Sequence, residues 1–177
     1  LGVTAETDAR EAADNRRAFS GGVVTNLKGT FQGMLSQPMP SIGTGDFTLY
    51  WEGKKLTQGG NFAKFLFKGD NGTEDFSIQL DITSGGSYSN GAVTFDFVSG
   101  SKATILCGAG YFDSDAIFKF TFDRDGVASV YKNGELSGTV DISGNSNIDL
   151  DFTSVDWFNT QNVDWIGRGL AILNTAL

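Results

Sequence analysis

Apolar and polar residues alternate with a period of two over most of the chain that follows residue 23. The clearest example is Asp75–Ile82, in which Phe76, Ile78, Leu80 and Ile82 occupy every second position without an error. Such alternation is typical of a β-strand with one face on a core and one in water. The intervening Ser77, Gln79 and Asp81 are therefore expected to face solvent. The same period predicts further strands at Asp46–Glu52, Phe62–Lys68, Ala92–Val98, Lys102–Cys107, Ala116–Asp123, Val127–Lys132 and Asn147–Thr153, and within residues 23–35 and 168–173.

Short turn motifs separate the predicted strands. Asn133-Gly134 stands between two of them and is a strong hairpin signal, and Asp125-Gly126 is a second. Gly69–Gly72, Gly85-Gly86 and Asn90-Gly91 indicate other turns. Roughly ten strands spaced by about 8–12 residues favour two packed antiparallel sheets. The predicted fold class is therefore an all-β sandwich.

The first 20 residues have a different pattern. Residues 4–19 are charged and rich in alanine, without glycine or proline, and Ala5, Ala9, Ala12 and Phe19 fall on one helical stripe. Ser20–Gly22 would end such a helix. We predict a short α-helical stalk over residues 1–20, which could end a coiled coil, followed by the sandwich over 21–177. The alternative is a solvated lead-in to the sandwich.

Composition narrows the possible chemistry. The 177 residues include 24 Gly and 15 Phe but only 2 Pro, which suits short strands joined by tight turns. The sequence has no His, so Ser-His-Asp triads and His-based metal sites are excluded. The single cysteine, Cys107, excludes an intrachain disulfide and is expected to be a buried small apolar residue. A net charge of −8 argues against nucleic-acid binding, and no apolar run approaches the length of about 18 residues that predicts membrane insertion.

Five segments in order carry a resemblance to a known family: Asp46–Trp51, Phe65–Gly69, Phe118–Gly126, Val130–Leu136 and Trp165–Gly167. Together they resemble the concanavalin A-like lectin/glucanase superfamily and, within it, the laminin-G-like domains. Leu170–Leu177 is similar to that family's closing strand, although the segment before it is shorter than usual. The resemblance implies a jelly-roll sandwich that binds sugars or protein surfaces, often with Ca²⁺. Some members of the superfamily hydrolyse glycans.

The N-terminal run resembles the helical linkers of tailed-phage fibre and baseplate proteins. This resemblance implies location in a virion, as a tail or surface fibre, or outside a cell. It also implies assembly as a homotrimer.

Glycan hydrolysis requires two carboxyl groups on either side of the scissile bond. The glucanases of this superfamily carry Glu-x-Asp-x-Glu, and Asn147–Asp151 keeps that spacing with Asn and Asp in place of both glutamates. Asn cannot transfer the catalytic proton, so Asp149 and Asp151 are expected to lie on a solvated strand face. We therefore predict that the domain is not an enzyme.

Two acidic loops are candidate Ca²⁺ sites because Ca²⁺ takes several oxygen ligands from tight loops. The stronger candidate provides Asp113 and Asp115, and the other provides Asp70 and Asn71. Acidic turn residues also form local hydrogen bonds without any metal, so both readings stay open.

A sugar site is expected in the polar segment Thr153–Asn162, interpreted as a long loop that displays Trp157 and Phe158. An exposed aromatic face can stack on a sugar ring, and Asp156, Asn159 and Gln161 offer hydrogen bonds beside it. Tyr88 is a second loop aromatic with weaker support. In the alternative, Trp157 folds back onto the core, where Trp51 and Trp165 are expected.

These features lead to three hypotheses. The first is a non-enzymatic domain that recognises a cell-surface carbohydrate or protein and is displayed on a multimeric viral fibre or adhesin. The second is a structural module that packs against its neighbours and binds no ligand. The third, a glycan hydrolase that uses Asp149 and Asp151, has the least support.

Overall fold

The computed structural model describes residues 27–31, 35–38, 42–56, 62–69, 74–82, 88–97, 100–150, 152–159 and 165–173. The predicted stalk at residues 1–20 lies outside them. Within the described residues, none of the helices has the length and hydrophobicity that a membrane crossing requires.

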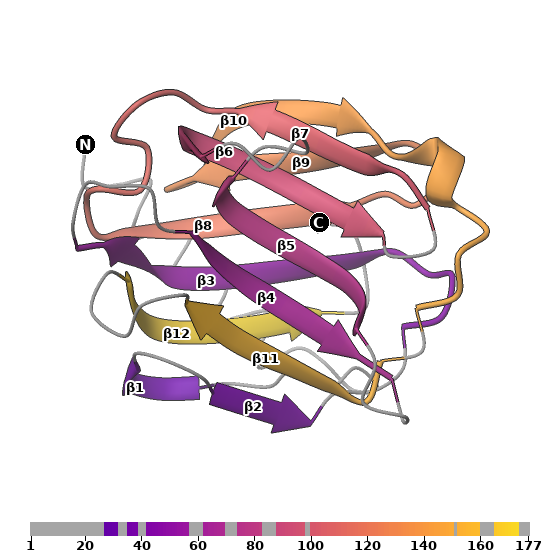
Figure 1. Ribbon diagram of the computed structural model, residues 1–177, viewed down its shortest axis with the longest axis horizontal. Helices are drawn as coiled ribbons and strands as arrows, with labels where there is room; N and C mark the ends of the chain where they lie inside the picture. The colour runs from indigo at the N-terminus through magenta and orange to yellow at the C-terminus, as the bar shows by residue number, and fades with distance from the viewer. Residues whose placement is uncertain are drawn as a thin grey trace.

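Twelve strands in the described part of the chain form two antiparallel sheets that lie face to face (Figure 1). Sheet A contains, in spatial order, β1 (Leu27–Phe31), β12 (Trp165–Leu173), β3 (Phe47–Lys55), β8 (Ala116–Phe122), β9 (Val127–Lys132) and β10 (Glu135–Asp141). Sheet B, in front in Figure 1, contains β2 (Leu35–Pro38), β11 (Ser154–Asn159), β4 (Ala63–Lys68), β5 (Glu74–Ile82), β6 (Tyr88–Phe97) and β7 (Lys102–Leu106). The predicted all-β sandwich of two antiparallel sheets is confirmed.

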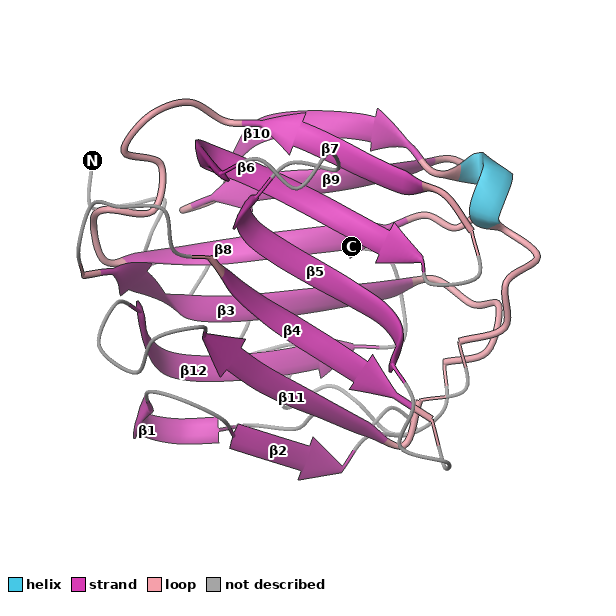
Figure 2. Ribbon diagram, viewed as in Figure 1, coloured by secondary structure: helices cyan, strands magenta, loops and turns pink. Residues whose placement is uncertain are grey.

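Consecutive strands change sheets at one side of the sandwich. β1 pairs with β12 in sheet A, whereas β2, which follows β1 along the chain, pairs with β11 in sheet B. β11 and β12 are likewise consecutive and belong to different sheets. Figure 2 shows that the described chain is almost entirely strand, with one short helical turn, η1 (Ser143–Asn145), between β10 and β11.

Aromatic rings fill the space between the sheets. Phe47 of sheet A stacks on Phe122 at 4.1 Å between ring centroids and meets the edges of Phe67 and Phe76 from sheet B. The predicted inward row Phe118, Phe120 and Phe122 is fully buried, as are Trp51 and Trp165. These predictions are confirmed, and they place one continuous apolar core between the layers.

The β9–β10 hairpin is confirmed at Asn133-Gly134. Both residues have positive φ, 51° and 85°, as a two-residue turn between twisted strands requires. The Asn133 side chain also accepts a hydrogen bond from the Ile117 amide at 3.0 Å. This contact fixes the turn to the start of β8.

The predicted strand Asn147–Thr153 is wrong. Leu150 makes only an isolated bridge to Gly43, although Leu150 and Phe152 are buried as expected. Arg124 provides the physical reason, because its guanidinium donates to the carbonyl oxygens of Asn145 and Ile148 at 2.9 and 2.6 Å. The guanidinium, in place of a neighbouring strand, therefore binds the backbone before Leu150.

Candidate functional site

One residue of β5 breaks the alternation that its sequence displays. Asp81 has a φ of 69°, a left-handed conformation that is uncommon outside glycine, and the pairing of β5 with β6 is irregular between Leu80 and Ile82. The expected outward carboxylate is consequently buried, with 3% of Asp81 exposed, whereas Ile82 is only partly buried. Left-handed non-glycine residues often mark functional or tightly constrained sites.

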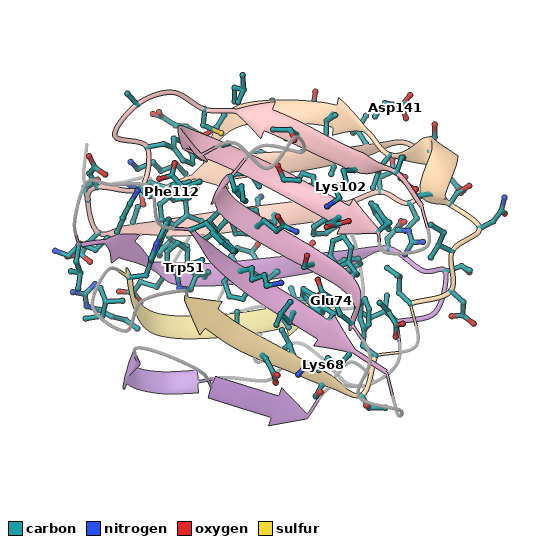
Figure 3. The ribbon with its side chains drawn as sticks, in the orientation of Figure 1. Trp51, Lys68, Glu74, Lys102, Phe112 and Asp141 are labelled. Atoms are coloured by element: carbon teal, nitrogen blue, oxygen red, sulfur yellow. The ribbon has the colours of Figure 1, made fainter. Side chains whose placement is uncertain are left out.

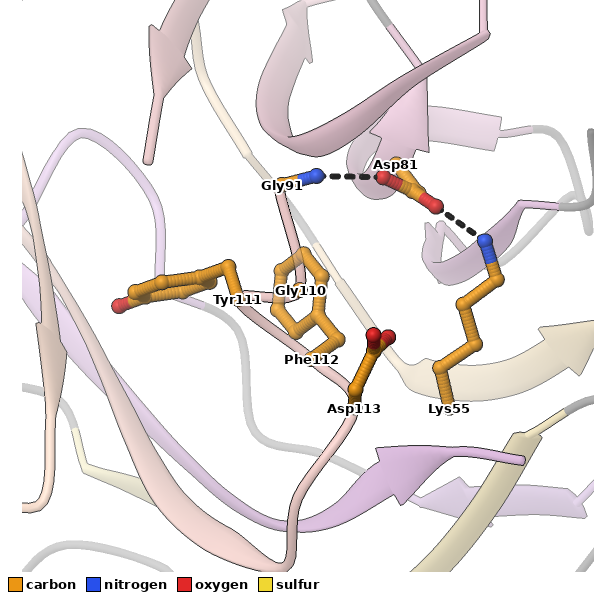
Figure 4. Close-up of a pocket in the computed structure, with 7 residues that line it drawn as sticks. All are labelled: Lys55, Asp81, Gly91, Gly110, Tyr111, Phe112 and Asp113. Atoms are coloured by element: carbon orange, nitrogen blue, oxygen red, sulfur yellow. Dashed lines mark hydrogen bonds and ion pairs between the residues drawn. The ribbon is translucent and has the colours of Figure 1, made fainter. Parts of the chain in front are cut away.

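The Asp81 carboxylate has two partners inside the protein. One oxygen pairs with the Lys55 ammonium from the end of β3, and the other accepts a hydrogen bond from the Gly91 amide at 2.6 Å (Figure 4). Lys55 is itself buried, and its ammonium lies 5.7 Å from the centroid of the Trp165 ring. A buried ion pair is favourable only with such additional contacts, because both charges lose hydration.

Gly91 brings β6 close to the connection between β7 and β8. Its φ is +81°, and a Cβ there would lie 2.0 Å from the Gly108 carbonyl oxygen. The Cys107 amide donates to the Gly91 carbonyl at 2.9 Å on the same side. The predicted turn at Asn90-Gly91 is therefore wrong, because both residues belong to β6 and glycine is needed for this close approach.

These contacts enclose a small recess at the sandwich end where β3 and β7 terminate. It is lined by Lys55, Asp81, Gly91 and the segment Gly110–Asp113. The Lys55 amide donates to the Phe112 carbonyl at 2.7 Å, and the Phe112 ring is buried against the core. Figure 4 shows the Asp113 carboxylate between Phe112 and Lys55, with the Tyr111 ring turned away from the ion pair. The recess thus combines buried groups at its base, the Lys55–Asp81 pair and Phe112, with the exposed Asp113 at its opening.

Burial controls the titration of the groups beside the recess. It raises the pKa of the Cys107 thiol from 9.0 to about 11, although a hydrogen bond with Tyr111 and the charge of Lys132 oppose the change. Burial also raises the pKa of Tyr111, whose hydroxyl donates to the Ser137 hydroxyl at 2.6 Å. Cys107 is therefore a protonated, half-buried thiol at neutral pH and a poor nucleophile.

The stronger predicted Ca²⁺ loop carries carboxylates with different surroundings. Asp115 contacts Lys54 at 3.2 Å and also pairs with Arg168. Slight desolvation, which would raise the pKa of Asp115, is outweighed by these cations, so its pKa is lowered. Within the described part of the chain, no three acidic or thiol side chains gather as a metal-binding group. Ca²⁺ binding by Asp113 and Asp115 stays a prediction, and Asp70 and Asn71 lie outside the described residues.

The predicted sugar-binding loop is a strand for most of its length. Residues Ser154–Asn159 form β11, which pairs with β4 on one side and β2 on the other. Trp157 pairs with Phe65 of β4 and Leu35 of β2 in the register. The loop interpretation was wrong because polar residues obscure the alternation, and pairing on both sides fixes the strand.

The six predicted sugar contacts are not all placed by the structure. Asp156 is 4% exposed, and its carboxylate lies 2.7 Å from the Lys68 ammonium across the strand pair. The backbones of Trp157, Phe158 and Asn159 belong to β11 and that of Tyr88 begins β6, but the positions of these four side chains lie outside the described structure, as does all of Gln161. Their role in binding therefore stays a prediction.

The Lys55–Asp81 pair was missed by sequence reasoning. The two residues are 26 positions apart, and each stands among residues of an ordinary strand pattern. The Asn90-Gly91 pair did indicate an unusual backbone conformation, but it was interpreted as a turn between strands. Asp149 is exposed and does not line this recess, and its proposed hydrolytic partner Asp151 lies outside the described residues.

Comparisons with known proteins gave a match at the level of structure. No protein-family model and no curated protein sequence matched. This chain shares its fold with botulinum neurotoxin binding domains. The serotype D ligand-binding domain in complex with N-acetylneuraminic acid gives a TM-score of 0.62 at 12% identity, over 89% of this chain and 44% of the other.

Two further solved structures extend the likeness. The binding domain of Paraclostridial Mosquitocidal Protein 1 gives a TM-score of 0.61 at 13% identity, with 87% of this chain and 43% of that chain covered. The binding domain of botulinum neurotoxin DC in complex with rat synaptotagmin II gives 0.58 at 12%, with 89% and 44% covered. The chain thus spans less than half the length of these proteins, and the likeness establishes the sandwich fold alone.

Proposed function

We propose that this domain is a non-enzymatic recognition module for a cell-surface carbohydrate or protein. The observation that carries the proposal is the recess, where the buried Lys55–Asp81 ion pair and the close approach of Gly91 to Gly108 lie beside the segment Gly110–Asp113. Binding loops that are rigid before contact lose less conformational entropy on association. The structural neighbours support the proposal, since they are binding domains, one in complex with N-acetylneuraminic acid and one in complex with rat synaptotagmin II.

The segment around the recess has the polar chemistry that such recognition uses. Asp113, Ser114 and Asp115 are exposed, and the half-buried Tyr111 ring lies next to them. Carboxylate and hydroxyl oxygens can accept hydrogen bonds from sugar hydroxyls or from a peptide backbone. The concanavalin A-like and laminin-G-like resemblance and the predicted Ca²⁺ ligands Asp113 and Asp115 are compatible with this arrangement.

Binding to a glycan array and to intact bacterial cells, with and without EDTA, tests the proposal. We expect the wild-type chain to bind and Asp113→Ala to bind at least about tenfold more weakly, a loss that a single charged hydrogen bond can account for. Glu135→Ala removes a similarly exposed carboxylate from β10 and should bind as the wild type does. Loss of binding in EDTA would support Ca²⁺, and absence of binding on every surface would contradict the recognition function.

Trp157 has a separate test. If its ring contacts the ligand, Trp157→Ala should reduce binding on the same array while the thermal unfolding midpoint changes little. A large fall in the midpoint with unchanged affinity per folded molecule would instead assign Trp157 to the core. The second outcome would remove Trp157 from the proposed site without affecting Asp113.

The second candidate function is a structural module, and two exposed leucines favour it. Leu106 at the end of β7 is 68% exposed, and Leu136 in β10 is 58% exposed. The two strands meet where a Cβ on Gly138 would lie 2.6 Å from the Ile105 side chain. A subunit contact there would cover both leucines.

Sedimentation tests this structural role and the proposed homotrimer on a viral or adhesive fibre. The chain from residue 1 should form a multimer, and removal of residues 1–20 should reduce its mass to that of a monomer if the predicted stalk causes assembly. Leu136→Ser should weaken assembly only if the β7–β10 side is the contact. A monomer at all concentrations would contradict both the trimer and the structural role.

A further inference from the structure

An arginine of sheet A stands outside the regular pairing of its strand. The register of β12 with β3 shifts between Gly167 and Gly169, so Arg168 has no partner residue in β3. Such a β-bulge redirects the side chain of the extra residue, and bulges are common beside functional sites. At Gly53, which lies opposite Gly167, a Cβ would be 2.3 Å from the Ile166 carbonyl oxygen. The two strands therefore pack tightly at the bulge, which fixes where the Arg168 side chain leaves the sheet.

Arg168 shares one carboxylate with a lysine. Its guanidinium Nη1 pairs with Asp115 Oδ1, and the Lys54 ammonium, near the end of β3, lies 3.2 Å from Asp115 Oδ2. Each oxygen of the Asp115 carboxylate thus contacts one cation. We call Lys54 and Arg168, together with the Asp115 carboxylate between them, the bridged cation pair.

The bridged cation pair is accessible from solvent. The side chains of Lys54, Arg168 and Asp115 are 29%, 33% and 49% exposed. A guanidinium carries five N–H donors and an ammonium carries three. In the described part of the chain, the Lys54 and Arg168 side chains make polar contacts with Asp115 alone. Most of their donors are therefore left for a ligand, which need not break an existing contact.

The bridged cation pair has one unbalanced positive charge. Two cations share one carboxylate, and the exposed Glu52, two residues before Lys54 in β3, is not within ion-pair distance of either cation. One further anionic group would balance the charge. A polyanion would instead meet Glu52 and a domain with a net charge of −8. The site therefore fits a ligand with a single negative charge.

The protein's own anion at this position indicates which ligand group fits. Asp115 spans the two cations with the two oxygens of one carboxylate, and a ligand carboxylate has the same shape. Arginine also forms paired, parallel hydrogen bonds with planar carboxylates. The guanidinium nitrogens that Asp115 does not use can bind such a group from the solvent side.

Groups that could bind the rest of a sugar immediately precede Asp115. Asp113 and Ser114 are both exposed, and carboxylate and hydroxyl oxygens can form hydrogen bonds with sugar hydroxyls. The segment is joined to the end of β3 through the Phe112 carbonyl, which accepts a hydrogen bond from the Lys55 amide at 2.7 Å. An acidic sugar can use both the cations and these groups, whereas a simple carboxylate can use the cations alone.

We propose that the bridged cation pair binds the carboxylate of an acidic sugar. Arg168 and Lys54 are the binding residues, and Asp115 is a positioning residue that needs no Ca²⁺ for this role. The inference rests on the proposed recognition function and adds the ligand class to it.

Nuclear magnetic resonance titration of the isotopically labelled full chain tests the proposal. The acidic sugars are D-glucuronate, D-galacturonate and N-acetylneuraminate; methyl glucopyranoside is the neutral sugar, and acetate and sulfate are the simple anions, all at equal ionic strength. We expect at least one acidic sugar to shift the backbone amide signals of Asp115 and Arg168. The neutral sugar should not shift them, and the simple anions should bind more weakly.

Two variants and a control assign the binding to the bridged cation pair. Arg168→Lys keeps the charge but loses the paired donors, and Lys54→Ala removes the second cation, so each should raise the Kd of the acidic sugar about tenfold. Lys102→Ala removes a lysine that pairs with Asp96 on sheet B and should leave the Kd unchanged. Figure 3 shows Lys102 over sheet B, apart from Phe112. Thermal unfolding establishes that each variant is folded.

The remaining outcomes separate this site from recognition in general. Equal shifts with the neutral sugar, equal affinity for acetate or sulfate, or an unchanged Kd in both variants would overturn the site. Array or cell binding that survives in both variants but is lost in Asp113→Ala would also overturn it and leave the recognition function standing. Selective binding of a free acidic sugar without array or cell binding would support the site and contradict the recognition of a cell surface.

Discussion

At the scale of single residues, Asp81 shows how a strand can bury a charged side chain that the sequence pattern predicts to face solvent. The left-handed backbone turns the Asp81 carboxylate toward the Lys55 ammonium and the Gly91 amide. Residues of β3, β5 and β6 therefore meet at this carboxylate. Neither charge can be lost alone, because the partner would stay buried without compensation. The pair therefore fixes the end of β3 beside the end of β5.

Asp81→Asn should test this coupling. Asn adopts the left-handed conformation readily and still accepts the Gly91 hydrogen bond, but it leaves the Lys55 ammonium unpaired. We expect the free energy of unfolding in urea to fall by about 3 kcal/mol. The double variant Asp81→Asn/Lys55→Met should regain part of the lost free energy of unfolding. The control Glu135→Gln, on the surface, should change the free energy of unfolding little. Equal losses in the single and double variants would contradict the coupling.

The raised pKa values of Cys107 and Tyr111 predict a loss of stability in alkali. The unfolded chain releases the Cys107 proton near 9.0, whereas the folded chain holds it until about pH 11. The folded state therefore binds more protons between these values, and the free energy of unfolding falls as pH rises through that interval. Tyr111 adds a change of the same sign. Urea midpoints of wild type and Cys107→Ala across this interval should show a shallower decline for the variant.

At the scale of elements, the close approach of β6 to the β7–β8 connection depends on Gly91. A Cβ at residue 91 would lie 2.0 Å from the Gly108 oxygen, whereas a Cβ at Gly108, with φ +99°, has no atom within 4 Å. The two glycines are therefore a matched pair, since both have positive φ and only one also has a steric neighbour.

Gly91→Ala should cost about 3 kcal/mol or more of unfolding free energy, because backbone displacement adds to conformational strain. Gly108→Ala should cost only about 1 kcal/mol from its φ. Chemical denaturation measures both values. Similar losses in the two variants would show that sterics at Gly91 contribute little.

The sequence was most informative where one face of a strand is uniformly apolar. Ala116–Phe122 and Val127–Lys132 were predicted within one residue, because the Phe row and the Asn-Gly turn are local signals. The pattern did not predict β11, whose Asp156 pairs with Lys68, a residue distant in sequence. It wrongly predicted a strand around Leu150, where the Arg124 guanidinium binds the preceding backbone carbonyl oxygens. The recess was not predictable for the same reason, since its ion pair joins strands that are remote in sequence.

At the scale of the molecule, the sheets share one aromatic core, so they should unfold together. Phe47 of sheet A contacts Phe67 and Phe76 of sheet B as well as Phe122 of its own sheet, and it is fully buried. The outer face of sheet A adds a smaller buried cluster of Tyr50, Ala171 and Leu173. Neither sheet retains its packing without the other.

Phe47→Ala should lower the free energy of unfolding by about 4 kcal/mol through the cavity it leaves. The loss should appear at the same urea midpoint by tryptophan fluorescence, which reports Trp51 and Trp165 in the core, and by far-ultraviolet circular dichroism. Separate midpoints for the two probes would instead indicate sheets that unfold independently.

The irregular backbone at Asp81 also limits how β5 can be transplanted or redesigned. A designer who replaced Glu74–Ile82 with an idealised extended strand would keep every apolar position and see no defect in the pattern. The regular geometry would direct Ile82 inward and the carboxylate to water, and Lys55 would lose its counter-ion. A graft of this strand must therefore copy the left-handed step together with the side chains.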